Sequence, residues 1–427
     1  MKVLIVGGGG REHAIALKIK ENPEVTALYA APGNGGIAQI ATCLPFKATD
    51  VDGIVRWAAE NKVDFVIVAP DDPLCLGMVD ALAEQGIPAF GPRKNAAIIE
   101  GSKVFSKNLM KKYGIPTAAY ETFDDYDAAV KYLQTADMPI VVKADGLALG
   151  KGVLICPDRE SAVEAVASMM REAKFGASGA RVVIEEFLTG PEVSVLAFTD
   201  GKTVKPMVSS MDHKRALDHD EGLNTGGMGT IAPNPYYTPE VAAECMEKIF
   251  LPTIAAMNAE GRTFTGCLYF GLMMTPKGPK VIEYNCRFGD PETQVVLPLL
   301  KSDLLTIMRA TVDGTLADTP VEFASGAACC VVLASGGYPV SYKSGYPISG
   351  LDEAGKTATV FHAGTKLVDG QIVTAGGRVL GVTATANTLE AAIDKAYQAA
   401  DKITFTDMHM RRDIGQRALA SRKESHS

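Results

Sequence analysis

A glycine-rich segment with two lysines begins at Lys143, between two apolar runs. It differs from the Walker A pattern, because Gly146 and Gly150 are one residue too close and Lys151 is followed by Gly152. We interpret it as a strand–loop–strand flap over a polyphosphate, since glycines let the backbone move and lysines meet phosphate charge. A surface hairpin with solvated lysines ranks second, because Lys143 ends an apolar strand, where an unpaired ammonium group is costly.

Two oxygen-bearing side chains, Glu283 and Asn285, lie two residues apart at the end of another apolar run. On a strand, residues i and i+2 face the same side, so the pair presents two oxygens together, as a Mg²⁺ site requires. The alternative is an edge strand with its polar residues outward. The run that follows, residues 287–292, is unusually dense in charge, glycine and proline for a mere edge.

Two other segments each allow a binding and a structural interpretation. Residues 181–188 read as a strand that ends in Glu185 and Glu186 and suits recognition of an adenine edge and a ribose. A solvated strand end is the simpler interpretation of that segment alone. Residues 212–215 form a basic patch near the glycine-rich run 222–229, which suits a polyphosphate or an acyl phosphate and equally a solvated turn.

The N-terminal loop Gly7–Gly10 follows an apolar strand and precedes a helical pattern. Such a loop can aim backbone N–H groups and a helix N-terminus at a phosphate. The dinucleotide fingerprint is broken, because Glu12 stands where the third glycine is needed and the second strand ends without an acid. Phosphate binding, assisted by Arg11, and a tight turn required only for packing remain equally compatible with the loop.

The sequence around these segments predicts an α/β protein. Continuous apolar runs alternate with helical patterns over residues 1–100, which predicts a parallel sheet covered on both faces. From about residue 120, short strands and two helices predict a small α+β module. Mixed elements follow to residue 325, and short strands with one long helix occupy the rest, ending in a polar stretch from Arg411.

Composition excludes several classes of protein. Lys and Arg total 42 and Asp and Glu total 50, so the net charge of −8 argues against bulk affinity for nucleic acid or anionic membranes. The eight cysteines form no CxxC pair, and no run of 18 apolar residues occurs. The N-terminal apolar stretch is too short for a signal peptide. We therefore expect a cytoplasmic protein with no membrane or nucleic-acid partner.

These motifs, in this order, resemble the ATP-grasp superfamily and, within it, the glycinamide ribonucleotide synthetases, also called phosphoribosylamine–glycine ligases. The run from Asn285 to Gln294 is the most specific part of the resemblance, which extends over nearly the whole chain. Asp71 is a small departure, since the family usually has Glu there. The other segments that carry the resemblance are 9–13, 31–34, 100–103, 143–153, 212–215, 224–229, 336–339 and 361–365.

The resemblance implies an α/β fold of the ATP-grasp type, with an N-terminal Rossmann-like domain, a small mobile α+β lid and a C-terminal mixed α/β domain. It divides the chain into 1–102 (Rossmann-like domain), 103–190 (linker helix and lid), 191–325 (ATP-grasp core with the metal site) and 326–427 (C-terminal domain). The implied activity is the ATP-dependent joining of glycine to 5-phosphoribosylamine, through glycyl phosphate, in purine biosynthesis. Mg²⁺ or Mn²⁺ would be the cofactor, and a monomer is expected.

The resemblance also implies roles for individual residues. Glu283 and Asn285 would hold the metal, and the loop Gly8, Gly9, Gly10 and Arg11 would take the 5′-phosphate of the ribosyl amine. Catalytic roles fall to Arg287, Asp290, Asp212 and Lys214. The residues implied to bind ATP are Lys103, Lys143, Gly146, Gly150, Lys151, Gly152, Glu185, Glu186, Phe187, Leu188 and Glu192.

Three other functions compete with this interpretation. A dehydrogenase is disfavoured by the broken dinucleotide fingerprint. Another ATP-grasp enzyme, a carboxylate–amine ligase or the carboxylase component of a biotin-dependent enzyme, is disfavoured by the run 287–294. A nucleotide-binding regulator without chemistry would bind ATP but would release no ADP in response to glycine.

Overall fold

The computed structural model describes residues 1–148 and 151–424. Its N-terminal part is a parallel sheet with the strand order β3-β2-β1-β4-β5, which confirms the predicted α/β arrangement. Two helices precede the next part of the chain, α5 (Lys94–Gly101) and α6 (Lys103–Tyr113). The elements of the sheet and its cover are β1 (Lys2–Gly7), α1 (Gly10–Lys20), β2 (Ala27–Pro32), β3 (Thr42–Cys43), α2 (Val51–Glu60), β4 (Phe65–Val68), α3 (Asp71–Cys75), α4 (Met78–Glu84) and β5 (Ala89–Phe90).

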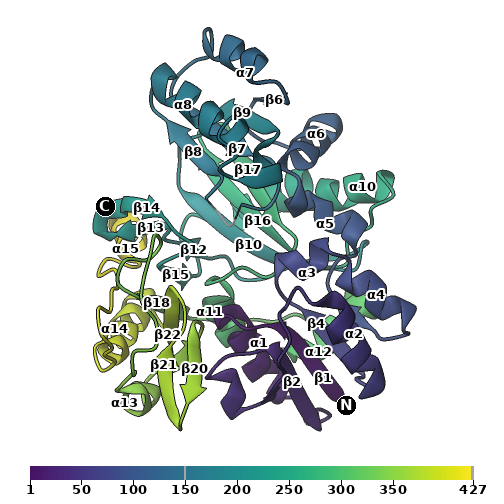
Figure 1. Ribbon diagram of the computed structural model, residues 1–427, viewed down its shortest axis with the longest axis vertical. Helices are drawn as coiled ribbons and strands as arrows, with labels where there is room; N and C mark the ends of the chain where they lie inside the picture. Colours follow the sequence, from purple (N-terminus) through teal and green to yellow (C-terminus); the bar gives the residue numbers. More distant parts are fainter. Residues whose placement is uncertain (149–150, 425–427) are drawn as a thin grey trace.

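Alternate residues of β1 belong to different cores, which explains its unbroken apolar sequence. Leu4 and Val6 pack with residues of α2 and α4, whereas Val3 and Ile5 pack with α1 and with α12 (Leu304–Asp313). Helices therefore cover both faces of the sheet (Figure 1). The strand order reverses between β1 and β4, and in open α/β sheets ligands bind at the carboxyl ends of strands beside such a reversal.

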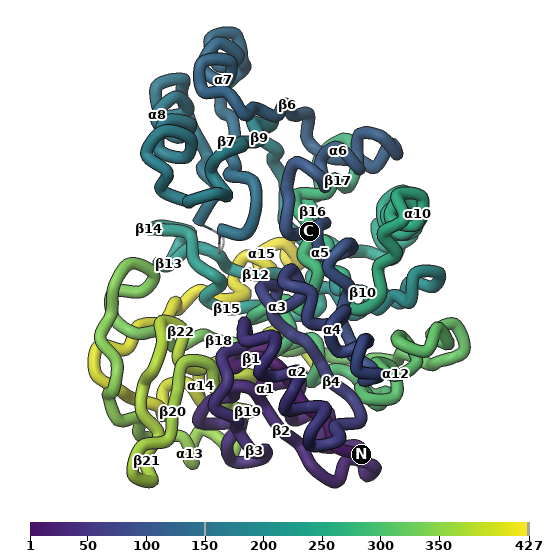
Figure 2. Tube along the Cα trace, turned by 45° about the vertical axis from the view of Figure 1, so that its right-hand side comes forward, coloured from purple at the N-terminus to yellow at the C-terminus, as the bar shows by residue number. Residues whose placement is uncertain are grey.

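The lid is a four-stranded antiparallel sheet with the order β6-β9-β7-β8, backed by two helices. It has its own small core and lies at one end of the molecule, away from the N-terminal and C-terminal sheets (Figure 2). This confirms the predicted α+β module. Its elements are β6 (Tyr120–Phe123), α7 (Tyr126–Leu133), β7 (Ile140–Ala144), β8 (Val153–Cys156), α8 (Arg159–Met170) and β9 (Val182–Glu186).

A second antiparallel sheet, of order β11-β10-β16-β17, lies between the lid and the N-terminal sheet (Figure 1). Strand β17 carries a bulge at Ile282, because Gly271 is opposite Glu283 whereas Leu272 is opposite Val281. The elements of this region are β10 (Glu192–Thr199), β11 (Val204–Pro206), α9 (Pro239–Cys245), α10 (Leu251–Ala259), β16 (Gly266–Thr275), β17 (Gly278–Asn285) and α11 (Thr293–Val296).

The C-terminal sheet has the order β12-β15-β18-β22-β19. Its first two strands come from residues 211–212 and 229–232, so they cross the boundary that the sequence places at residue 325, and the four-part division stays a prediction. The elements are β12 (Met211–Asp212), β13 (Arg215–Leu217), β14 (Glu221–Asn224), β15 (Gly229–Ala232), β18 (Ala327–Ala334), α13 (Leu351–Gly355), β19 (Thr359–His362), β20 (Thr365–Val368), β21 (Gln371–Thr374), β22 (Arg378–Ala386), α14 (Leu389–Ala400) and α15 (Gln416–Glu424).

Local contacts define the start of α6 and hold the C-terminal stretch. Helix α6 begins at Lys103 because the Ser102 side chain caps it by accepting a hydrogen bond from the Phe105 N–H at 3.1 Å. The polar stretch from Arg411 is packed against the body of the protein, and the Arg411 side chain is 1% exposed. Within the described residues, no helix combines the length and apolar character needed to cross a membrane.

Candidate active site

A cavity of about 450 Å³ lies where the lid, the β10–β17 sheet, the N-terminal sheet and the C-terminal region meet. Most of the side chains singled out from the sequence line it, although they are up to about 280 residues apart along the chain. This convergence is what a shared substrate site requires. The lining residues expected from the sequence are Arg11, Lys103, Lys143, Gly146, Lys151, Gly152, Lys214, Glu283, Asn285, Arg287 and Asp290.

Glu100 organises the end of β17. One carboxylate oxygen accepts hydrogen bonds from Asn285 Nδ2 at 2.9 Å and pairs with Arg287 Nη2 at 3.0 Å. The other accepts from the Cys286 N–H at 2.9 Å and from its Sγ at 3.0 Å. Because Asn285 donates its amide nitrogen to Glu100, its carbonyl oxygen is left for the cavity. This role of Glu100 was not predicted, because sequence spacing gives no sign that a helical glutamate meets a strand 185 residues later.

Glu283 is a half-buried carboxylate among cations. Burial alone would raise its pKa, but Lys214, Lys143 and Lys103 outweigh this effect and lower the pKa below the usual value. The group is therefore ionised at neutral pH. An ionised carboxylate beside a free amide oxygen is a donor set suited to a hard divalent cation.

Lys143 and Lys107 hold Glu185 between them. The Lys143 ammonium lies 2.5 Å from Glu185 Oε1 and donates to the Ile282 carbonyl at 3.2 Å. The Lys107 ammonium lies 3.2 Å from Glu185 Oε2 and donates to Thr117 Oγ1 at 2.7 Å. Glu185 is only 5% exposed, so it acts as a counter-ion for lysines and does not line the cavity. Glu186, Phe187, Leu188 and Glu192 do not line it either.

Asp145 connects the lid to α6. Its Oδ1 accepts hydrogen bonds from Ser102 Oγ at 3.0 Å and from the Val104 N–H at 3.2 Å, while Oδ2 pairs with Arg181 at 2.6 Å. Lys103 donates to the Gly146 carbonyl at 2.8 Å, so its ammonium points at the lid loop. Gly150, which the sequence placed in the ATP site, lies outside the described residues.

The N-terminal loop is already engaged by protein groups. The Gly9 N–H donates to Glu12 Oε2 at 2.9 Å, and the Arg11 N–H lies 3.4 Å from Asp290 Oδ2. The Arg11 guanidinium binds Glu12 and donates to the Phe288 carbonyl at 3.1 Å. Of the four residues predicted to bind phosphate, Arg11 lines the cavity, whereas Gly8, Gly9 and Gly10 do not.

Lys214 lines the cavity and pairs with Asp212. Lys214 Nζ lies 3.4 Å from Asp212 Oδ2, and the neighbouring carboxylates and Tyr269 outweigh burial and raise the Lys214 pKa well above its usual value. The Asp212 side chain is buried and does not itself line the cavity. Among the described residues, the buried Arg287 Nε has no hydrogen-bond partner, and Asp212 Oδ2 has only the Lys214 ammonium at 3.4 Å. Buried polar atoms of this kind are costly unless a ligand pairs with them.

Three further residues line the cavity and were not predicted from the sequence: Glu292, Tyr269 and Arg378. Tyr269 donates to Glu292 Oε1 at 3.3 Å, and the Arg378 guanidinium donates to the Asp290 carbonyl at 2.8 Å. Burial, followed by the Asp212 charge, raises the pKa of Glu292 to about 7. Glu292 lies inside the run 287–292, whose charge density was the available signal, but sequence alone could not choose between its carboxylates.

Three family models match successive parts of the chain: the N domain of phosphoribosylglycinamide synthetase at residues 1–100, its ATP-grasp (A) domain at 101–293 and its C domain at 328–417. The phosphoribosylamine–glycine ligase of Halalkalibacterium halodurans is 48% identical, with 100% of this chain and 99% of that protein covered. That of Rhodopirellula baltica is 49% identical, with 98% of each covered.

Solved structures agree with this assignment. The crystal structure of phosphoribosylamine–glycine ligase from Thermotoga maritima matches with a TM-score of 0.86 and 35% identity, covering 97% of this chain and 100% of that one. The biotin carboxylase domain of a Hydrogenobacter thermophilus 2-oxoglutarate carboxylase has a TM-score of 0.73 at 18% identity, covering 96% and 91%, and shows the shared fold alone. From its N-terminal sheet to its C-terminal sheet, the chain belongs to the phosphoribosylglycinamide synthetase family.

Proposed function

We propose that this chain is an ATP-dependent ligase that joins glycine to 5-phosphoribosylamine, giving glycinamide ribonucleotide, ADP and phosphate in purine biosynthesis. The observation that carries the proposal is the convergence of several lysines, the Glu283–Asn285 pair and Arg287 on one cavity, in a chain with all three family domains.

The chemistry needs no nucleophile from the protein. A glycine carboxylate oxygen attacks the γ-phosphorus of ATP, ADP leaves, and glycyl phosphate forms. The ribosyl amine nitrogen then attacks the acyl carbon, the carbon–oxygen bond to phosphate breaks, and the amine loses a proton. Catalysis of both steps rests on positioning the reactants and neutralising the charge that develops.

The residues at the end of β17 fit a divalent metal ion. Glu283 is ionised, and Asn285 is held by Glu100 with its carbonyl oxygen free. Within the described residues no group of three His, Cys, Asp or Glu side chains forms a metal cluster. One carboxylate and one amide oxygen suit Mg²⁺ or Mn²⁺, which take their remaining ligands from phosphate and water. The ion would neutralise phosphate charge during transfer.

ATP would be held by the lid and α6. At the cavity, the Lys103 ammonium donates to the Gly146 carbonyl, the Lys143 ammonium pairs with Glu185, and Lys151 is exposed. Phosphate oxygens would pair with these cations when the lid closes. We assign adenine and ribose to the backbone at residues 186–188 and to Glu192, at the edge of the lid.

Glycine is a zwitterion, and Arg287 and Asp290 offer one charge of each sign at the cavity. Arg287 Nε, which has no hydrogen-bond partner in the structure, would pair with the glycine carboxylate, and Asp290 with its ammonium group. Lys214, paired with Asp212, would then stand beside the acyl group as phosphate leaves. We assign the 5′-phosphate of the ribosyl amine to residues 8–11, although the N–H groups of Gly9 and Arg11 would have to exchange their present partners. A monomeric, cytoplasmic enzyme remains our expectation.

The test is an ADP-release assay in which glycine, 5-phosphoribosylamine and metal are omitted in turn. The proposal predicts full turnover only with all components and identifies glycinamide ribonucleotide as the product. Bicarbonate-dependent ADP release without glycine would favour a carboxylase instead. ATP binding without ADP release under any condition would favour a regulator and contradict the proposal.

A further inference from the structure

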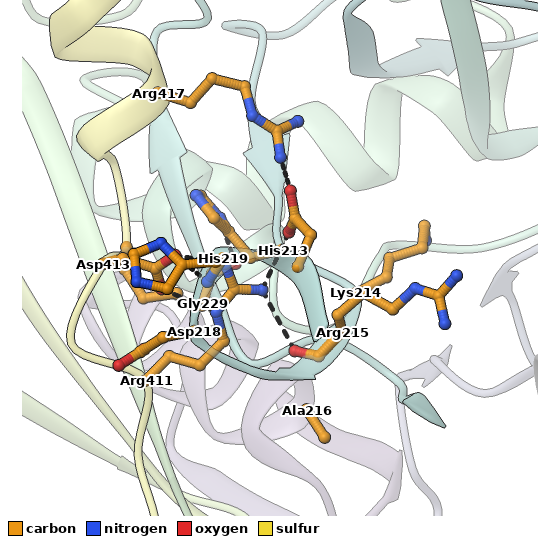
Figure 3. A network of polar contacts seen from close by, with 12 residues as sticks. His213, Lys214, Arg215, Ala216, Asp218, His219, Gly229, Arg411, Asp413 and Arg417 are labelled. Carbon is orange, nitrogen blue, oxygen red and sulfur yellow. Dashed lines mark hydrogen bonds and ion pairs between the residues drawn. The ribbon is translucent and has the colours of Figure 1, made fainter. Parts of the chain in front are cut away.

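The segment from His409 to Arg417 lies along the β13–β14 hairpin, far from it in sequence (Figure 3). Arg411 makes the central contact, with its guanidinium buried. Two of its nitrogens bind the two carboxylate oxygens of Asp413 at 2.8 and 2.9 Å. The third donates to the Arg215 carbonyl at 3.1 Å and to Asp220 Oδ1 at 3.2 Å. Four N–H donors of this planar guanidinium are therefore engaged, which fixes its partners in orientation as well as in distance.

His213 ties the same two segments together from the other side. Burial, followed by the Arg411 charge, lowers its pKa to about 4, so the ring is neutral at physiological pH. Its Nε2 accepts a hydrogen bond from the Gly415 N–H at 3.1 Å. Its Nδ1 therefore carries the proton and donates to the Gly229 carbonyl at 3.1 Å.

Lys214 lies between two residues that the C-terminal segment holds in place. The residue before it, His213, is held by Gly415, and the residue after it, Arg215, is held by Arg411. The Lys214 carbonyl accepts hydrogen bonds from both the N–H and the hydroxyl of Thr225 at 2.7 Å. Thr225 lines the cavity, as does Lys214 itself. The C-terminal segment thus fixes the backbone from which a cavity lysine extends.

We propose that Arg411 is a positioning residue that holds the Lys214 ammonium at the cavity wall beside Asp212. This inference rests on the proposed function, because it assigns Lys214 to the glycine side of the reaction. Arg411 does not line the cavity, so its effect on turnover must pass through the hairpin. ATP use depends on lysines of the lid and α6, which this network does not contact, and should be spared.

The test compares Arg411→Met with Arg412→Met, a matched neighbour. The Arg412 guanidinium is 57% exposed and pairs with Asp401 on α14's C-terminal side at 2.7 Å, away from Lys214. We expect Arg411→Met to lower kcat/KM for glycine about tenfold while the KM for ATP changes less than about twofold. Arg412→Met should match the wild type in both.

A double-mutant cycle with Lys214→Met separates positioning from general destabilisation. If Arg411 acts through Lys214, adding Arg411→Met to Lys214→Met should cost less than about twofold more. If Arg411→Met fails to fold, the same kinetics are measured on Asp220→Asn, which weakens the Arg411 network at a half-exposed residue. Unchanged glycine kinetics in a folded variant, or effects that simply multiply in the double variant, would overturn the inference. Failure of the wild type to form product would instead overturn the proposed function.

Discussion

The cavity has two sides that are built differently. We call residues 283–292, from the end of β17 to α11, the floor, and the lid residues 144–148 and 151–153 the roof. On the floor, Glu292 is buried, and the half-buried Arg287 and Asp290 are held by protein partners, as Glu100 holds Arg287 at 3.0 Å. On the roof, the tie to α6 runs through Asp145 and the Gly146 carbonyl, and Lys151 is exposed.

This difference separates two tasks of a group-transfer enzyme. Groups that stabilise developing charge work best when they are already oriented, because no reorganisation is then needed during the reaction. Groups that admit ATP and then exclude water must move. The floor therefore should govern kcat, whereas the roof should govern nucleotide affinity and access.

The largest effect is expected from Glu283→Gln on the floor. The change removes the charge of the carboxylate that we propose as a metal ligand, and should lower kcat by about two orders of magnitude or more, comparable to the loss of a main transition-state contact. Steady-state kinetics over a range of Mg²⁺ concentrations measures it, with Glu121→Gln on the exposed face of β6 as control. Wild-type turnover at saturating Mg²⁺ would rule out Glu283 as the ligand.

Glu100→Gln tests whether the floor depends on its buried partner. All four groups that bind Glu100 are donors, so a Gln amide nitrogen must face a donor whichever way it turns. We expect a loss of about ten- to a hundredfold in kcat/KM, typical of residues that orient metal ligands. Glu24→Gln, which alters an exposed ion pair with Arg309, is the control. Equal activity of the two variants would refute the role.

Glu292→Gln tests the floor through the pH dependence of the free energy of unfolding. Burial and Asp212 raise the pKa of Glu292 from 4.5 to about 7, so the folded protein keeps a proton that the unfolded chain loses within this window. The stability from this group is thus present at low pH and lost as pH rises through about 7. We expect the variant to gain about 1–3 kcal/mol over wild type near pH 8, and little near pH 5.

Denaturant unfolding at both pH values measures that difference, with Glu164→Gln on α8 as an exposed control. A gain of the same size at the two pH values would mean that Glu292 is not the titrating group.

The smallest effect is expected on the roof. Lys151→Ala should raise the KM for ATP about three- to fivefold and leave kcat nearly unchanged, because an exposed lysine gains its partner only when ATP is bound. Lys174→Ala, another exposed lysine of the lid, is the matched control. A fall in kcat as large as that of the floor variants would remove the distinction between the two sides.

Patterns within one element were predictable from sequence, and contacts between distant elements were not. The strand alternation that pairs Glu283 with Asn285 is local, and the apolar run of β1 identifies a buried parallel strand. Glu100 reaches the same site from a helix 185 residues earlier, which no spacing reveals. Glu185 reads as a ligand-facing strand end, yet its place opposite two lysines depends on α6 packing against the lid.

The N-terminal loop and the C-terminal stretch show the same limit. The Glu12 carboxylate accepts a hydrogen bond from the Gly9 N–H, so the donor that suggested a phosphate site is already occupied in the structure. Arg411 begins the polar C-terminal stretch, and its burial depends on acceptors from the folded β13–β14 hairpin, the Arg215 carbonyl and Asp220, as well as on Asp413.

The most direct test of the two-sided cavity is hydrogen exchange with and without ATP and Mg²⁺, followed in peptides from both sides. The account predicts that exchange slows in peptides covering residues 144–148 and 151–156, whereas residues 283–292 are already protected and change little. Slowing on the floor with an unchanged roof would contradict it, because the lid would then not close over the nucleotide and the floor would form only on binding.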